Sequence, residues 1–228
     1  MVIPTCLSAL AFCGAGWLLL KRDFARQKRE PGAEHEEHEN AGSALFSKKT
    51  LAFGAVMTFL CVGIAAALPL LYEGNSFLFN IKRVCLLSLL WPVACADYAS
   101  FRIPNLFILA GGVCRVVIFA FELAFEGEGV WARAGSELIA AAALAGAALL
   151  CGLAIKNSIG FGDVKLFIVM GLMLGLDGIW SAVFLSLIVS FIISVVLLAA
   201  KKKTRRDMIP FAPAIMAGTY VSVFITGR

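Results

Sequence analysis

Residues 160–200 read GFGDVKLFIVMGLMLGLDGIWSAVFLSLIVSFIISVVLLAA. The charged residues in this stretch are Asp163, Lys165 and Asp177. A transmembrane helix needs about 20 predominantly apolar residues. The stretch is long enough for two such helices, which we place at 162–176 and 179–200, the first of them short. This pattern is typical of a protein that crosses a membrane more than once.

The rest of the 228-residue chain repeats the pattern. Hydrophobic residues make up 61% of the sequence and charged residues 15%, whereas soluble domains average about 25% charged residues. Further apolar runs lie at about 2–20, 51–72, 77–96, 105–125, 134–155 and 208–226. The third run carries Lys82 and Arg83 near its start, so we expect either that this span begins later or that both side chains extend outward to the headgroups. We therefore predict an all-α, polytopic integral membrane protein of about eight transmembrane helices. A secreted disulfide scaffold, a disordered tail and a DNA-binding domain are excluded by this composition.

Basic residues indicate how the spans are oriented. Fifteen of the 20 Lys and Arg residues fall in or beside segments 21–50, 97–105, 156–165 and 201–206, all on one side of an eight-span arrangement. Because loops rich in Lys and Arg stay in the cytoplasm, we predict that these segments are cytoplasmic and that both termini lie outside. The first apolar run lacks a basic segment before it, so we interpret it as a retained span rather than a signal peptide.

Cysteine and histidine give no clear metal site. The seven cysteines all lie in apolar runs and form no CxxC pair, which favours a packing role. His35 and His38 belong to PGAEHEEHENAG at 31–42, where Glu and His could ligate zinc, although a short acidic run of this kind is usually solvated. We predict neither a metal nor a cofactor.

Two carboxylates stand apart from the others. Asp97 ends the third span in ACADYASFRIPN, and Asp163 opens the sixth in SIGFGDVKL. The predicted topology places both at the cytoplasmic membrane boundary. Two neighbouring carboxylates do not ionise together easily, so one keeps its proton while the other activates water. The alternative is that Asp163 only caps its helix and Asp97 only ends its span at the headgroups.

The residues near the two aspartates could have either a functional or a purely structural role. Gly160 and Gly162 favour irregular backbone before Asp163, which membrane proteins tolerate where it lines a cavity. Lys165 and Arg102 either contact substrate or extend to lipid headgroups as anchors.

Prolines and one buried arginine complete the set of candidate residues. Pro104 and Asn105 are expected to shape the turn before the fourth span. Pro210 and Pro213 either break the last span and open a groove, or simply start its helix. Arg115 lies inside the fourth span and needs a partner, but Glu122, two turns away, is expected to be too distant.

Three motifs in order resemble the type IV prepilin peptidases, which are membrane aspartic proteases of the GxGD class. These motifs are DYASFRIPN at 97–105, GFGDVKL at 160–166 and IPFAPAIMAG at 209–218. The resemblance covers about residues 51–226. It implies that Asp97 and Asp163 are the catalytic pair of an aspartic endopeptidase. It also implies prepilin or pseudopilin substrates, cut after the Gly that ends their short basic leader, at the cytoplasmic face of a bacterial-type inner membrane.

The loop after the first span differs from that of the long family members. Those proteins carry a domain with paired CxxC motifs there, associated with N-methylation of the new N-terminus, whereas segment 21–50 is short and has no cysteine. We therefore predict a short form without N-methyltransferase activity or zinc. Residues 1–50 would be a first helix plus a short cytoplasmic loop, and residues 51–228 the protease domain, with no nucleic-acid partner.

Other functions stay open from the sequence. A non-catalytic scaffold for pilus or secretion assembly and a small ion-coupled transporter are the main alternatives. Proteases of the presenilin type share the GxGD motif, but their first motif is expected as Tyr-Asp, whereas here Asp97 precedes Tyr98. The acidic run 34–39 is a hypothetical docking site for a basic leader.

Overall fold

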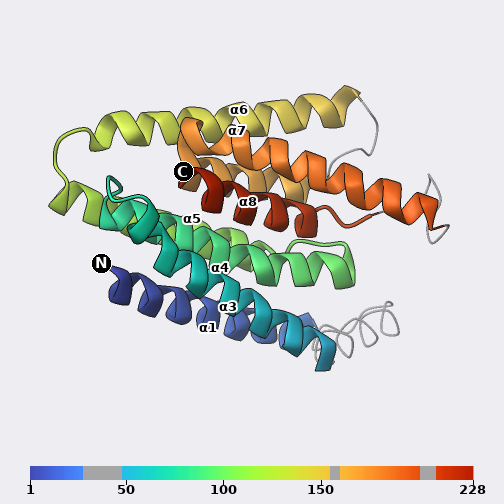
Figure 1. Ribbon diagram of the computed structural model, residues 1–228. Coiled ribbons are helices and arrows are strands. Elements are labelled where there is room, and N and C mark those ends of the chain that lie inside the picture. Colours follow the sequence, from blue (N-terminus) through green and yellow to red (C-terminus); the bar gives the residue numbers. More distant parts are fainter. Residues whose placement is uncertain (28–47, 155–159, 201–208, 228) are drawn as a thin grey trace.

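The described part of the chain is helical. A computed structural model describes residues 1–27, 48–154, 160–200 and 209–227, and none of these residues lies in a strand (Figure 1). The helices are α1 (Val2–Gln27), α3 (Lys48–Leu71), α4 (Phe77–Ser100), α5 (Asn105–Phe125), α6 (Val130–Ala154), α7 (Phe161–Ala199) and α8 (Ala212–Thr226). Six of them are long and apolar enough to cross a membrane, and α8 is a shorter apolar helix. The predicted all-α, polytopic membrane fold is confirmed.

Helix α7 contains a reversal. Its 39 residues would measure about 58 Å if straight, far more than the roughly 30 Å of a hydrocarbon core. Gly175 has φ 67° and ψ −177°, a conformation open to glycine. Both ends of α7 consequently lie at the same end of the bundle (Figure 1).

The two halves of α7 account for two of the predicted spans. The expected boundary between 162–176 and 179–200 falls beside the observed break at Gly175. With α7 counted as two antiparallel halves, the described helices cross the bundle eight times. The eighth span begins later than expected, because α8 starts at Ala212 rather than near residue 208.

The ends of the helices sort into two groups (Figure 1). One end holds the junction of α4 and α5, the end of α6 and the start of α7, and the end of α7 and the start of α8, together with the end of α1 and the start of α3. The other end holds both chain termini and the reversal of α7. The described helix ends that border the segments predicted to be cytoplasmic thus share one end of the bundle, while the side of the membrane that this end faces stays a prediction.

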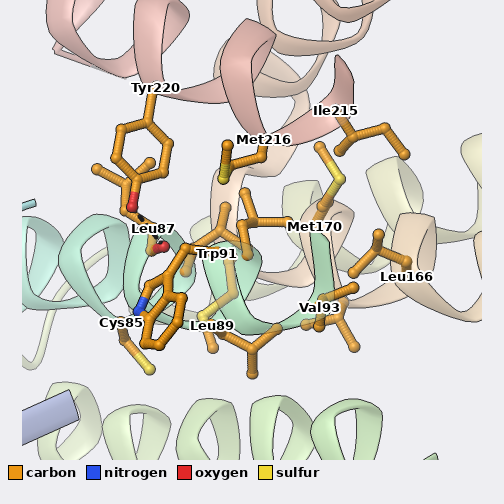
Figure 2. Close-up of a cluster of buried hydrophobic side chains, with 14 of the residues drawn as sticks. Cys85, Leu87, Leu89, Trp91, Val93, Leu166, Met170, Ile215, Met216 and Tyr220 are labelled. Atoms are coloured by element: carbon orange, nitrogen blue, oxygen red, sulfur yellow. Dashed lines mark hydrogen bonds between the residues drawn. The ribbon is translucent and has the colours of Figure 1, made fainter. Parts of the chain in front are cut away.

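Helix α4 lies at the centre of the bundle. Its side chains from Arg83 to Asp97 are all buried, and they pack against the first half of α7 and against α8. Figure 2 shows side chains of α4 beside Leu166 and Met170 of α7 and Met216 of α8, with the Tyr220 hydroxyl donating to the carbonyl of Leu87 at 2.9 Å. These contacts fix α4, α7 and α8 against one another.

The start of α4 contradicts one expectation. Lys82 and Arg83 were expected to lie before the third span or to extend outward to the headgroups. The helix instead begins at Phe77, and the two side chains are 1% and 2% exposed. Both side chains are buried because Lys82 forms ion pairs with residues of α5 and α6, and Arg83 donates hydrogen bonds to backbone carbonyls of α7.

Small residues allow two helix pairs to approach closely. A Cβ on Gly171 would lie 2.5 Å from the Cα of Ala141 on α6, and one on Gly218 would lie 2.3 Å from the backbone nitrogen of Ser186. Close backbone approach at small residues is typical of helix association in membranes, where lipid offers no hydrophobic driving force.

We expect Gly171→Ala to destabilise the protein by about 1–3 kcal/mol, because the added methyl group meets backbone that has no free space. Thermal unfolding in detergent measures the effect. Gly146→Ala on α6 is the matched control, since a Cβ there meets nothing within 4 Å. Equal unfolding temperatures for the two variants would contradict this packing.

Candidate active site

Asp97 lies in the last turn of α4 and is 7% exposed. Phe101 closes the helix in the left-handed conformation, φ 50°, and its N–H donates to the Asp97 carbonyl at 2.8 Å. The Asp97 side chain accepts a hydrogen bond at Oδ2 from the backbone N–H of Ala212, 2.9 Å away. First-turn amides have no partner within their own helix, and a negative charge is favourable at a helix N-terminus. The carboxylate of Asp97 is therefore held at the start of α8.

Asp163 lies in the first turn of α7 and is half-buried. Gly160 is the N-cap, and its carbonyl accepts from the Asp163 N–H at 3.0 Å. The side chain folds back toward this cap, with Oδ2 3.4 Å from the position that a Cβ on Gly160 would occupy. The Asp163 carboxylate interacts electrostatically with that of Asp97. The structure thus brings together two acids that are 66 residues apart in the sequence.

The loop between α4 and α5 packs on the start of α7. A Cβ on Gly162 would lie 3.1 Å from the Cβ of Ile103, which leaves little room for a side chain there. The Lys165 ammonium donates to Asn105 Oδ1 at 2.9 Å. Pro104 has extended backbone directly before α5. The first two motifs of the sequence are therefore in contact at one end of the bundle.

The third motif completes the arrangement. Pro213 is in the first turn of α8, where a missing N–H costs no helical hydrogen bond, and Pro210 precedes the helix. This geometry fits helix initiation, the second interpretation of these prolines. Because α8 begins here, the Ala212 amide meets Asp97.

Arg102 is exposed in the loop after α4. Its position at the end of the bundle agrees with both roles considered for it, an anchor at the headgroups or a contact to substrate, and both stay predictions.

Comparison with known proteins assigns the chain to a family. The model of the type IV leader peptidase family matches residues 84–199, about half of the chain. The chain belongs to the type IV leader peptidase family. The matched region contains both Asp97 and Asp163 and ends before α8.

A curated relative agrees with this assignment. The prepilin leader peptidase/N-methyltransferase of Bacillus subtilis (strain 168) is 33% identical over 66 residues, which is 29% of this chain and 27% of that protein. The alignment thus spans about a quarter of the relative's length. No solved structure matches the chain.

Charged residues inside this member of the leader peptidase family form a second group, which the sequence did not predict. Lys82, Arg115, Glu122 and Glu137 meet at the end of the bundle opposite the two aspartates. Arg115 Nη1 is 3.0 Å from Glu122 Oε2, so the expectation that this pair is too distant was wrong: two long side chains bridge two helical turns. The sequence did hold an indication of this group, because ionisable residues within membrane spans are costly to bury and usually pair with one another.

The described ranges offer no clustered metal ligands. Within residues 1–27, 48–154, 160–200 and 209–227, no group of three or more His, Cys, Asp and Glu side chains could hold a metal ion. All seven cysteines are free thiols, and Cys13, Cys61, Cys85 and Cys95 are buried. His35, His38 and the acidic run 34–39 lie outside the described residues, so a metal or docking role there stays a prediction.

We expect the Lys165–Asn105 contact to couple the starts of α5 and α7. Lys165→Met and Asn105→Ala should each lower stability by about 0.5 kcal/mol, because the hydrogen bond is exposed to solvent. The double variant should lose no more than either single variant. Thermal unfolding of all four proteins in detergent measures this, and fully additive losses would show that the contact does not form.

Proposed function

We propose that this chain is a membrane-embedded aspartic endopeptidase that removes the short basic leader from type IV prepilins or pseudopilins after Gly. Membership of the type IV leader peptidase family supports the substrate class. The observation that carries the proposal is that Asp97 and Asp163 lie at the same end of the bundle, where the loop that follows α4 packs on the start of α7. The third sequence motif supports it as well, since its first helical amide binds Asp97.

The proposed chemistry needs one proton shared by the two acids. Of the pair, Asp97 is better placed to carry the negative charge, because its Oδ2 accepts the N–H of Ala212 at a helix N-terminus. Asp163 then holds the proton. The ionised carboxylate takes a proton from water, whose oxygen attacks the carbonyl carbon of the scissile glycine, while the protonated acid donates to the carbonyl oxygen.

The tetrahedral intermediate then collapses. The C–N bond breaks as its nitrogen receives a proton from the pair and a hydroxyl group of the intermediate returns one to the pair. The products are a leader ending in a carboxylic acid, which then loses its proton to the solvent, and a mature pilin with a free amine. The two aspartates return to their starting state with one proton between them. In this scheme the nucleophile is water throughout, so no covalent enzyme intermediate forms.

The proposed location is a bacterial-type inner membrane with the aspartates facing the cytoplasm and both termini outside. The support is the clustering of basic residues in the sequence segments 21–50, 97–105, 156–165 and 201–206, since segments rich in Lys and Arg stay cytoplasmic. A pilin whose leader is cytoplasmic would meet the pair from this side.

We expect Asp97→Asn and Asp163→Asn each to abolish cleavage of a prepilin in membranes, with a loss of at least about 1,000-fold, because an amide keeps the shape but cannot carry the proton. Gel shift and N-terminal sequencing of the product measure cleavage. Asp177→Asn is the matched control, since it removes an exposed carboxylate just after the reversal of α7, at the end of the bundle away from the pair.

Three outcomes would count against this proposal. Cleavage by either site variant would show that the wrong carboxylate was chosen. Wild-type protein that is folded but inert on several prepilins would favour the scaffold or transporter alternatives. Loss of activity in Asp177→Asn as well would remove the special role of the pair.

We also propose that the chain does not methylate its product, because segment 21–50 has no CxxC motif. Mature pilin made by this enzyme in cells without another leader peptidase should carry an unmodified N-terminal amine. Mass spectrometry of the N-terminal peptide measures the difference of about 14 Da per methyl group. A methylated N-terminus produced by purified protein and a methyl donor would contradict this.

A further inference from the structure

Four charged side chains form a closed ring inside the bundle. Lys82 Nζ lies 3.0 Å from Glu122 Oε1 and also contacts Glu137 Oε1. Arg115 Nη1 lies 3.0 Å from Glu122 Oε2, and its Nε donates to Glu137 Oε2 at 2.8 Å. Two positive and two negative charges therefore neutralise one another across α4, α5 and α6.

This ring touches the backbone of α7 where the helix reverses. Arg115 Nε also donates to the carbonyl of Leu172 at 3.0 Å. Next to the ring, Arg83 donates from Nη1 to the carbonyl of Met173 at 2.6 Å and from Nη2 to that of Leu174 at 3.1 Å. We call the ring and Arg83 together the clamp.

The clamp supplies hydrogen-bond donors to backbone carbonyls of α7. The break at Gly175 leaves carbonyls at the end of the first half of α7 without their usual donors, and the buried interior offers no bulk water to replace them. Two arginines donate to three consecutive carbonyls there, and their positive charge is favourable at a helix C-terminus. On the other side of the break, the Leu176 N–H donates to Ser136 Oγ at 3.2 Å.

The first half of α7 connects the clamp to the candidate active site. Asp163 lies eleven residues before Leu174, about 16 Å along a helix. Between them the helix packs tightly: a Cβ on Gly171 would lie 2.5 Å from the Cα of Ala141, and one on Gly111 would lie 2.7 Å from Val169 Cγ1. A helix held this closely can move along its axis only if its end is released.

We infer that the clamp fixes the axial position of this half of α7, so that Arg83 and Glu137 are positioning residues for Asp163. The inference rests on the proposed peptidase function for its kinetic part. Glu137 acts by orienting Arg115 toward Leu172, and Arg83 acts by bridging two carbonyls with one planar group, which Lys cannot do.

The test compares Glu137→Gln and Arg83→Lys with Glu126→Gln. The control breaks an ion pair with Arg133 near the same end of the bundle, between the end of α5 and the start of α6. Arg83→Lys keeps the charge and serves as the milder variant if Glu137→Gln fails to fold. Gel filtration and circular dichroism in detergent establish folding before the other measurements.

The first readout reports position without any substrate. Ile103→Cys combined with Gly162→Cys places two thiols where the wild-type Cβ positions are 3.1 Å apart, near the range of a disulfide. Oxidation of membranes followed by peptide mass spectrometry measures the yield of this cross-link. We expect at least a threefold lower yield in the two clamp variants and an unchanged yield in Glu126→Gln.

The second readout is prepilin cleavage by proteins without the added cysteines. We expect kcat to fall about 10- to 100-fold in the clamp variants while KM stays within about twofold, because small displacements of a catalytic group cost rate rather than binding. Unchanged cross-linking and an unchanged kcat in folded variants would overturn the inference and leave the clamp a purely stabilising feature. A lower cross-link yield with an inactive wild-type enzyme would support the clamp and contradict the proposed peptidase function.

Discussion

The reversal of α7 at Gly175 is the constraint on which the arrangement of the site depends. A 39-residue apolar helix is too long for one crossing, and a break within the bundle exposes backbone groups that need partners. Arg83 and Ser136 supply those partners from α4 and α6. Because α7 turns back, its start and its end reach the same end of the bundle, and α8 begins there as well. Asp163 and Ala212 thus reach Asp97.

Asp97 joins this arrangement to the proposed chemistry. The side chain of the last turn of α4 accepts the first amide of α8, so a carboxylate at the end of one helix and the N-terminus of another stabilise each other. Asp163, supplied by a third helix, completes the pair. The three sequence motifs lie far apart in the chain because each begins or ends a different helix at this single end. Their order follows from the topology, and their closeness follows from the packing of α4, α7 and α8.

Much of this could be predicted from the sequence, and the rest depended on contacts between helices. Apolar runs predicted the crossings, and glycine and proline near Asp97 and Asp163 indicated the candidate site. The break in α7 was expected within a few residues of Gly175. The partners of the buried charged side chains could not be predicted. Lys82 and Arg83 are unexpected inside a span, and only the structure shows that Lys82 contacts Glu137 and that Arg83 donates to carbonyls of α7. Asp97 accepts a hydrogen bond from the backbone amide of Ala212. An alanine side chain does not indicate in the sequence that its backbone amide makes such a contact.

In the proposed enzyme, Asp97 and Asp163 together hold water against a prepilin glycine. A leader peptide with a hydroxyl-bearing statine at the scissile glycine imitates the tetrahedral intermediate, and the same peptide without the hydroxyl group does not. The most direct measurement is the affinity of both peptides for the purified protein in detergent. We predict binding about 100-fold or more tighter with the hydroxyl group, and equal affinities would contradict the shared role of the two aspartates.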